Sequence, residues 1–220
     1  GIFLLVGTSA QAFETTAKYA ILIDQQTGRV LLEKEADIAM APASMSKLMT
    51  ILMLYERLAD GSLAMDDTFP VSEKAWRMGG SKMFVGVNTR VPVKDLLRGI
   101  IVQSGNDACI VVAEGLASSE TAFAEQMTTR GTEIGLQNST FANATGWPHP
   151  EQRMSTRDLS KVALQLIEKF PQYYPIFSEK TFTYNGIRQG NRNPLLYRYD
   201  GADGLKTGHT EESGYGLVSS

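Results

Sequence analysis

Three short motifs in this chain carry residue types that could act together in acyl transfer. The first is Ser44 with Lys47 three positions later, the second is Ser104 with Asn106, and the third is the run Lys206-Thr207-Gly208. Because residues i and i+3 share one face of a helix, the amine of the first motif would lie beside its hydroxyl. Each pattern is weak alone, but their joint presence in fitting contexts predicts one nucleophilic site.

The segment around Ser44 has the properties that would activate a serine. Residues 44–59 are apolar on nearly every side of a helix, which predicts a buried central helix. A lysine rooted there loses solvation, which lowers the pKa of its amine, so that Lys47 could take the serine proton. The positive end of the helix dipole would favour an alkoxide on Ser44. The alternative is an ordinary N-cap serine followed by a solvated lysine, which a helix without a polar face disfavours.

The other two motifs fit the wall of a cleft. Ser104 and Asn106 fall in a break between two apolar helices, where a turn can direct both side chains into a cleft. Alone, this break would be interpreted as a polar turn between helices. Lys206 and Thr207 lie on an expected strand, where a cation and a hydroxyl can bind a carboxylate, and Gly208 permits close approach of a ligand. The alternative for Lys206 is an edge-strand lysine before a turn.

Composition excludes several other classes of protein. The 220 residues carry 21 Lys+Arg against 24 Asp+Glu, a formal net charge of -3, so no basic surface for nucleic acid is expected. With one cysteine, Cys109, and two histidines, neither a disulfide nor a Cys- or His-rich metal site is expected. No cofactor is expected either. We interpret Cys109 as a core residue, His149 as a loop residue, and His209 as either a supporting base or a surface residue.

The order of expected elements predicts an α+β fold. Strands are expected at both ends, as hairpins over residues 19–32 and 204–218, with β-type residues returning from Thr181. Between them we expect helices over residues 44–59, 92–101, 107–116, 120–134 and 155–167, with Gly61 ending the first. This order favours a mostly antiparallel sheet flanked by helices, with an inserted helical region.

The two ends of the sequence carry their own signals. An apolar run, residues 2–6, leads to Ala10-Gln11-Ala12, which is typical of the tail of a secretory signal peptide. We therefore expect residues 1–12 to be a signal-peptide remnant and residues 13–220 the working domain; the alternative for the run is a buried first strand. Residues 214–220 resemble a strand that has just begun, so a C-terminally incomplete domain is expected.

With the sequence around these motifs, the chain resembles the serine D-alanyl-D-alanine carboxypeptidases, which are low-molecular-mass penicillin-binding proteins. The likeness covers about residues 17–218, with S-G-N at residues 104–106 where β-lactamases usually carry S-D-N. It implies a β-lactamase/transpeptidase-like fold whose sheet continues past Ser220. The matching segments are residues 42–50, 80–85, 103–108, 141–143 with Gly146, 155–158, Asn193 with Leu195 and Leu196, and 203–210.

The resemblance also implies a role for each motif. Ser44 would be the acylated nucleophile, Lys47 its base, and Ser104 the relay that passes a proton to the leaving D-alanine. The oxyanion hole would be the backbone N–H groups of Ser44 and His209. The implied substrate-binding residues are Asn106, Lys206, Thr207, Gly208 and His209.

The resemblance implies partners and a location too. The substrate would be a peptidoglycan stem peptide ending in D-Ala-D-Ala, and β-lactam antibiotics would be inhibitors. The protein would be exported to the periplasm or to the outer face of the bacterial cytoplasmic membrane. Membrane contact would come only through a C-terminal anchor, which lies outside these 220 residues.

Three other functions use the same motifs. A DD-endopeptidase of the same family would differ only in the shape of the cleft. A penicillin-sensing domain would be acylated without turnover. A class A β-lactamase would need a deacylating glutamate in E-x-x-L-N; the nearest match begins at Glu133, where the asparagine falls one place late at Asn138, so we interpret Glu133 as structural.

Overall fold

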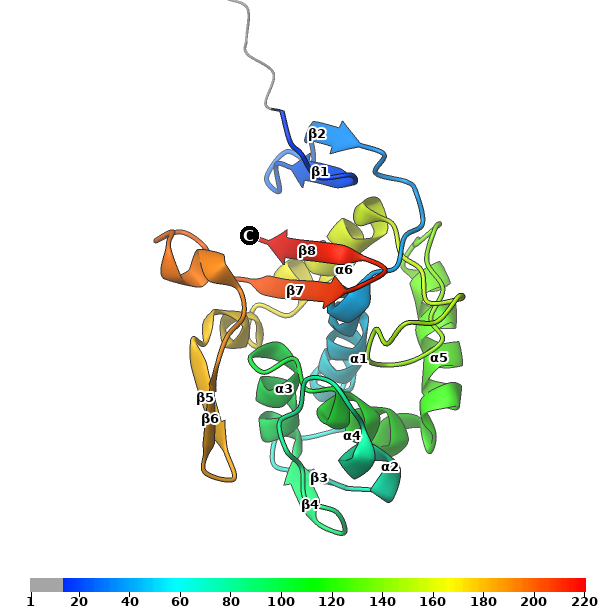
Figure 1. Ribbon diagram of the computed structural model, residues 1–220, viewed down its shortest axis with the longest axis vertical. Helices are drawn as coiled ribbons and strands as arrows, with labels where there is room; N and C mark the ends of the chain where they lie inside the picture. Colours follow the sequence, from blue (N-terminus) through cyan, green and yellow to red (C-terminus); the bar gives the residue numbers. More distant parts are fainter. Residues whose placement is uncertain (1–13) are drawn as a thin grey trace, which may run out of the picture.

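The computed structural model describes residues 14–220 (Figure 1). The predicted signal-peptide remnant therefore lies outside the described residues. Six α-helices occupy the middle of the chain: α1 (Lys47–Ala59), α2 (Glu73–Arg77), α3 (Val93–Ile101), α4 (Asn106–Ala117), α5 (Glu120–Glu133) and α6 (Thr156–Lys169). Short 3-10 helices are η1 (Ala43–Ser46), η2 (Tyr174–Ser178) and η3 (Pro194–Tyr197).

The strands form antiparallel pairs around these helices. The pairs are β1 (Ala20–Ile23) with β2 (Val30–Lys34), β3 (Thr68–Pro70) with β4 (Arg90–Pro92), β5 (Thr181–Tyr184) with β6 (Ile187–Gly190), and β7 (Leu205–Thr210) with β8 (Gly214–Ser219). In Figure 1 the β1–β2 and β7–β8 pairs lie toward one end of the molecule, with β7–β8 above most of α1 and α6 behind it, in contact with both β1 and β8. The predicted α+β class is confirmed.

Three details of the prediction are corrected. Within residues 14–220 the strands form four separate two-stranded ladders rather than one sheet, because β1 and β8 are not hydrogen-bonded to each other. The helix expected from residue 44 begins at Lys47, and the preceding η1 turn holds Ala43 at φ +48°. The sequence analysis did not find β3, β4 or α2, which are three to five residues long and too short to show a period.

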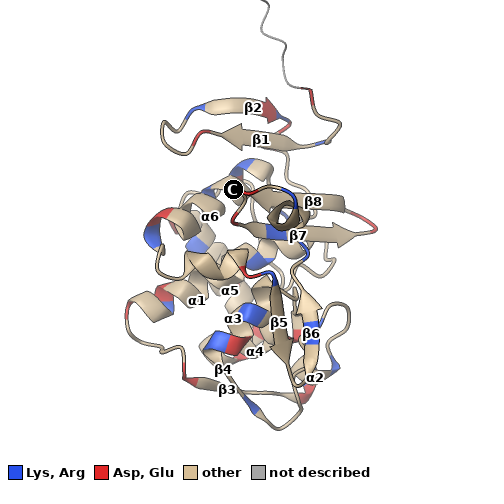
Figure 2. Ribbon diagram, turned by 90° about the vertical axis from the view of Figure 1, so that its left-hand side faces the viewer, with Lys and Arg blue, Asp and Glu red and all other residues tan. Residues whose placement is uncertain are grey.

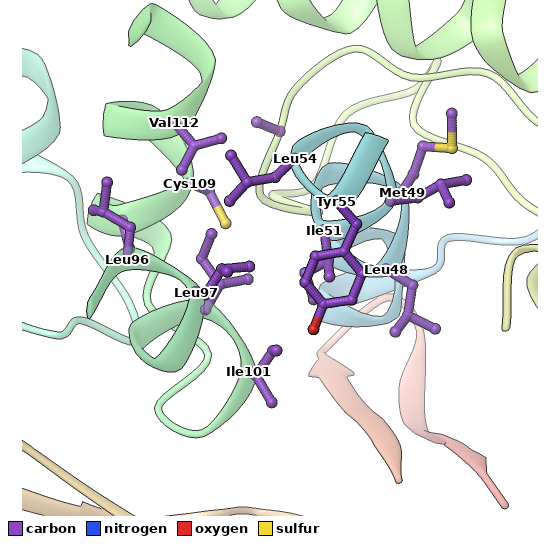
Figure 3. Packing of buried hydrophobic residues seen from close by; sticks show 14 of the residues in the cluster. Leu48, Met49, Ile51, Leu54, Tyr55, Leu96, Leu97, Ile101, Cys109 and Val112 are labelled. Atoms are coloured by element: carbon purple, nitrogen blue, oxygen red, sulfur yellow. The ribbon is translucent and has the colours of Figure 1, made fainter. Parts of the chain in front are cut away.

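Helix α1 is the centre of the hydrophobic core. Its packing partners include α3, α4, α5 and α6, and Tyr55 and Lys47 are among the largest side chains that are fully buried. Figure 3 shows α1 side chains meeting those of α3 and α4; the labelled residues are Leu48, Met49, Ile51, Leu54, Tyr55, Leu96, Leu97, Ile101, Cys109 and Val112. The prediction that Cys109 is a core residue is confirmed, since none of it is exposed.

Local signals explain how the helix ends are set. Ser155 Oγ accepts a hydrogen bond from the Asp158 N–H at 3.1 Å, so α6 starts where its capping sequence predicted. Gly61, at φ +78°, follows the end of α1 in the left-handed conformation that glycine adopts most easily. Acidic and basic residues are interspersed over the ribbon rather than gathered on one face (Figure 2). No helix of residues 14–220 is long and apolar enough to cross a membrane.

Because α1 is packed on all sides, truncating it should be costly. We expect Ile51→Ala to lower the free energy of unfolding by about 2–5 kcal/mol, the range for emptying a fully buried aliphatic site. Leu31→Ala is the control, since Leu31 is 56% exposed and its truncation should change stability by less than about 0.5 kcal/mol. Urea denaturation measures both, and equal effects would contradict the central position of α1.

Candidate active site

The amine of Lys47 is the centre of the site. Its Nζ lies 2.8 Å from Ser44 Oγ, 2.7 Å from Asn106 Oδ1 and 2.5 Å from the carbonyl oxygen of Thr145. The side chain is fully buried, and this burial lowers the pKa of Lys47 to about 8. The predicted loss of solvation is confirmed.

The three neighbours of Nζ decide what a neutral Lys47 can do. Asn106 Oδ1 and the Thr145 carbonyl oxygen only accept hydrogen bonds, so each takes one N–H of the amine. The Ser44 hydroxyl can donate as well as accept, so the lone pair of the neutral amine faces its proton. This geometry suits removal of a proton from Ser44 by Lys47.

Ser44 itself stands on the η1 turn rather than inside a regular helix. The turn is closed by a hydrogen bond from the Met45 N–H to the Pro42 carbonyl oxygen at 3.2 Å. Strand β7 packs against η1, and a Cβ on Gly208 would lie 3.1 Å from Met45 N and 3.1 Å from Pro42 O. The bare Cα of Gly208 thus allows the strand to reach the turn that carries Ser44, a role that sequence analysis did not foresee.

A second lysine–serine pair faces the cleft. Lys206 Nζ donates to Ser104 Oγ at 2.9 Å and to the Thr207 carbonyl oxygen at 3.1 Å. Burial, and then the charge of Lys47, lower the pKa of Lys206 well below its ordinary value. Ser104 has φ +57°, a backbone conformation that is uncommon outside glycine and that often occurs at functional sites.

Asp107, the first residue of the helix expected over residues 107–116, holds one wall of the site. Its carboxylate accepts hydrogen bonds from three successive N–H groups, those of residues 83–85, at 2.8–3.1 Å. Asn106 Nδ2 donates to the Gly79 carbonyl oxygen of the same wall at 2.9 Å. A Cβ on Gly105 would lie 2.9 Å from Asp107 Oδ1 and 3.1 Å from Met83 N, which explains why the motif is S-G-N here.

Arg192 is a cation of the cleft that sequence analysis missed. It lines the same cavity as Ser44, Ser104 and Thr207, and its guanidinium donates to Ser81 Oγ at 2.5 Å. None of the ion pairs within residues 14–220 includes Arg192. No motif marked it in the sequence, because the fold alone brings the η3 segment beside residues 79–85.

The predicted residues divide into three groups. Hydrogen bonds join Ser44, Lys47 and Asn106, and a separate hydrogen bond joins Ser104 and Lys206. Thr207, Gly208 and His209 line the same cavity, where the exposed His209 ring stacks on Tyr215 with centroids 4.1 Å apart. The residues placed away from this cavity are His149, which accepts the Glu151 N–H, and Glu133, which pairs with Arg130 on α5.

Together these contacts place a serine hydroxyl beside a fully buried lysine amine, an arrangement suited to acyl transfer. The sequence of residues 6–220 matches the family model for D-alanyl-D-alanine carboxypeptidases, the S11 peptidases, and the chain belongs to this family. The predicted family resemblance is thereby confirmed.

Relatives and solved structures agree with this assignment. D-alanyl-D-alanine carboxypeptidase DacA of Escherichia coli (strain K12) is 40% identical over 211 residues, covering 93% of this chain and 52% of the relative. The crystal structure of DacD from Francisella tularensis has a TM-score of 0.95 at 31% identity, covering 100% of this chain and 65% of the other. The chain thus spans about half the length of DacA.

A third similar structure has an antibiotic bound. Penicillin-Binding Protein D2 from Listeria monocytogenes, in its ampicillin-bound form, has a TM-score of 0.82 at 28% identity, covering 92% of this chain and 83% of the other. The bound β-lactam was observed in that protein. In this chain, a similar fold surrounds the Ser44–Lys47 pair.

The buried lysine predicts how acylation should depend on pH. Burial lowers the pKa of Lys47 to about 8, so the neutral, basic form grows as pH rises through that value. We expect the acylation rate of Ser44 by a fluorescent penicillin to fall about tenfold per pH unit below the midpoint and to level off above it. A profile measured from pH 6 to 10 that stays flat would contradict a titrating lysine base.

Proposed function

We propose that this chain forms the catalytic part of a serine DD-carboxypeptidase, which removes the terminal D-alanine from peptidoglycan stem pentapeptides. The observation that carries the proposal is the fully buried Lys47 amine, whose Nζ lies 2.8 Å from Ser44 Oγ and bonds to two other oxygens that can only accept. In the first step Lys47 takes the hydroxyl proton while Oγ attacks the carbonyl carbon before the last residue. The N–H groups of Ser44 and His209 would hold the resulting oxyanion.

The second half of acylation needs a proton at the leaving amine. Ser104 with Lys206 can supply it, since their 2.9 Å hydrogen bond forms a short path for a proton into the cleft. The C–N bond then breaks, D-alanine leaves, and Ser44 remains as an ester of the shortened peptide. Water attacks this ester and gives a proton to the Ser104–Lys206 pair, which lost one to the leaving amine. Lys47 returns its proton to Ser44 Oγ as the C–O bond breaks, so the peptide leaves with a free carboxyl group and the serine hydroxyl is restored.

The charges of the cleft favour a substrate with a free carboxylate. The residues that line the cavity include Lys18 and Arg192 and contain no Asp or Glu. We propose that Arg192 and Thr207 bind the carboxylate of the terminal D-alanine, next to the buried Lys206, while Asn106 binds the peptide amide. The Arg192 guanidinium donates to the Ser81 hydroxyl through Nη1, and its other N–H groups can donate to a carboxylate.

The proposal extends to inhibitors and location. A β-lactam carries a reactive amide and a carboxylate in the arrangement of D-Ala-D-Ala, so we propose that it acylates Ser44. Because the substrate is a cell-wall peptide, we propose that the protein is exported and works in the periplasm or at the outer face of the cytoplasmic membrane.

Product analysis tests the function directly. With the full-length protein we expect steady release of D-alanine from a stem pentapeptide, a slower reaction on a cross-linked dimer, and a penicillin adduct that outlasts a peptide turnover. Ser44→Ala should abolish both label and turnover, whereas Ser178→Ala, at an exposed serine of η2, should change neither.

Each other product pattern assigns a different function. Cleavage of the cross-linked dimer with no D-alanine release would identify an endopeptidase. Rapid penicillin hydrolysis without peptide turnover would identify a β-lactamase, although Glu133, the sequence candidate for its glutamate, is paired with Arg130. Stable labelling with no turnover would identify a sensor.

The carboxylate site makes a separate prediction. We expect Arg192→Met to lower kcat/KM on a free-carboxylate peptide by about 10- to 100-fold, the effect of losing a hydrogen bond to a charged group. The same change should leave an amidated peptide nearly unaffected. Arg188→Met is the matched control, because Arg188 is an exposed arginine of β6 that does not line the cavity. Equal losses on both peptides would refute a carboxylate contact at Arg192.

A further inference from the structure

One of the two fixed acceptors of Lys47 belongs to a loop. The Thr145 carbonyl oxygen, 2.5 Å from Lys47 Nζ, lies in the connection between α5 and α6. A loop carbonyl has no ladder of neighbours to hold its direction, so its position must be set by other bonds. The N–H groups of Thr145 and the two residues after it all bond to one side chain, while Gln152, Glu120 and Thr50 bond to residues 142–144.

Within the part of the chain that the structure describes, the side-chain amide of Asn143 forms hydrogen bonds only with this loop. Its Oδ1 accepts from the N–H groups of Thr145, Gly146 and Trp147 at 3.2, 2.8 and 3.1 Å, and from the Thr145 hydroxyl at 3.0 Å. Its Nδ2 donates to the Trp147 carbonyl oxygen at 2.9 Å. The Asn143 side chain therefore fixes the course of residues 145–147.

The loop is also fitted against the turn that carries the nucleophile. Gly146 has φ +82°, and a Cβ there would lie 1.9 Å from the Ala43 carbonyl oxygen and 2.7 Å from Ser46 Oγ. The hydroxyl of Thr50, on α1, donates to the Ala144 carbonyl oxygen at 2.8 Å. A shift of the loop would therefore be transmitted both to the amine and to the serine.

The position of this loop affects the direction in which the Lys47 amine can accept a proton, because the Thr145 carbonyl oxygen binds one of its N–H groups. A neutral amine has two N–H groups and one lone pair, and Asn106 Oδ1 and the Thr145 carbonyl oxygen fix the two N–H groups. We propose that Asn143 is a positioning residue for the Ser44–Lys47 pair: it holds the Thr145 carbonyl oxygen where Lys47 directs its lone pair at Ser44.

Charge does not account for this role. The charged and titratable groups that act on Lys47 include Cys109 and Asp107 of α4, Arg192 near η3 and Lys206 of β7. None of them lies in residues 142–147, whose contacts with the site are a carbonyl oxygen and the packing of Gly146. Asn143 is neutral, so its effect should be on the orientation of the amine.

The experiment measures acylation of Ser44 by a fluorescent penicillin in the full-length protein. We expect Asn143→Ala to lower the plateau rate at alkaline pH by about 100-fold, as expected when a reacting group is displaced by about 1 Å. Asn143→Asp keeps the Oδ1 acceptor for the three N–H groups, so its plateau should stay within about threefold of the wild type. Asn138→Ala is the matched control; Asn138 lies in the same connection, and its side chain makes no hydrogen bond within residues 14–220.

Melting temperatures separate positioning from simple destabilisation. A purely structural asparagine would lower the melting temperature of Asn143→Ala and leave its plateau rate unchanged, and that result would overturn the proposal. If the alanine variant does not fold, Asn143→Ser takes its place, with a plateau reduced at least tenfold expected because its shorter side chain cannot reach all three N–H groups. An unchanged plateau in that folded variant would equally overturn it.

The proposal rests on the proposed function only for the role of Lys47 as a base. Penicillin labelling of the wild type without release of D-alanine would refute the carboxypeptidase and leave this test intact. Release of D-alanine together with an undiminished plateau in Asn143→Ala would refute the role of Asn143 alone.

Discussion

The burial of one amine is the constraint on which this structure depends. Lys47 is fully enclosed, and the oxygens that its Nζ contacts are neutral. Burial lowers the pKa of Lys47 from 10.5 to about 8, so keeping the amine protonated costs about 3 kcal/mol of the free energy of folding. The folded state holds this proton less tightly than the unfolded state does. The cost to stability therefore has its full size below pH 8 and disappears as the pH approaches 10.5. The apolar core around α1 offsets this cost, and in the proposed mechanism the same burial makes the amine basic enough in its neutral form.

Holding a buried amine in one orientation requires hydrogen-bond acceptors in fixed positions. For Lys47 these are Asn106 Oδ1 and the Thr145 carbonyl oxygen, and the fold positions the two in a similar way. Asp107 accepts from the successive N–H groups of residues 83–85, and Asn143 accepts from those of residues 145–147. The first loop fixes Asn106 through its Nδ2 bond to the Gly79 carbonyl oxygen, and the second offers a carbonyl directly. Irregular backbone, which lacks a ladder of its own, is thus bound on each side of the amine by a side chain that accepts from three successive N–H groups.

The sequence predicts this site in part, and the division follows from physics. Ser44, Lys47, Ser104 and Lys206 could be found because their spacing and apolar setting are local properties of the chain. The Thr145 carbonyl oxygen could not, since every residue has a carbonyl and only the fold selects one.

The helices and strands also divide into those that local sequence predicts and those that depend on contacts between distant segments. The longer helices could be predicted from their periodicity, whereas α2, β3 and β4 are too short to show one. The pairing of strands into four ladders depends on contacts between distant segments, as does the approach of Arg192 to Ser81. The asparagine of the motif F-A-N at residues 141–143 was visible as part of the family resemblance, but its five bonds appear only in three dimensions.

The two lysine–serine pairs are electrostatically coupled, and this gives the proposed reaction an order. The charge of Lys47 lowers the pKa of Lys206, so a proton delivered to either buried amine weakens the hold of the other on its own proton. When Lys47 takes the proton of Ser44, Lys206 becomes a better donor to Ser104, 2.9 Å away. Attack on the carbonyl carbon and protonation of the leaving amine are then linked through the repulsion between two buried cations. Replacing either lysine should therefore affect both halves of acylation, because neither pair titrates independently of the other.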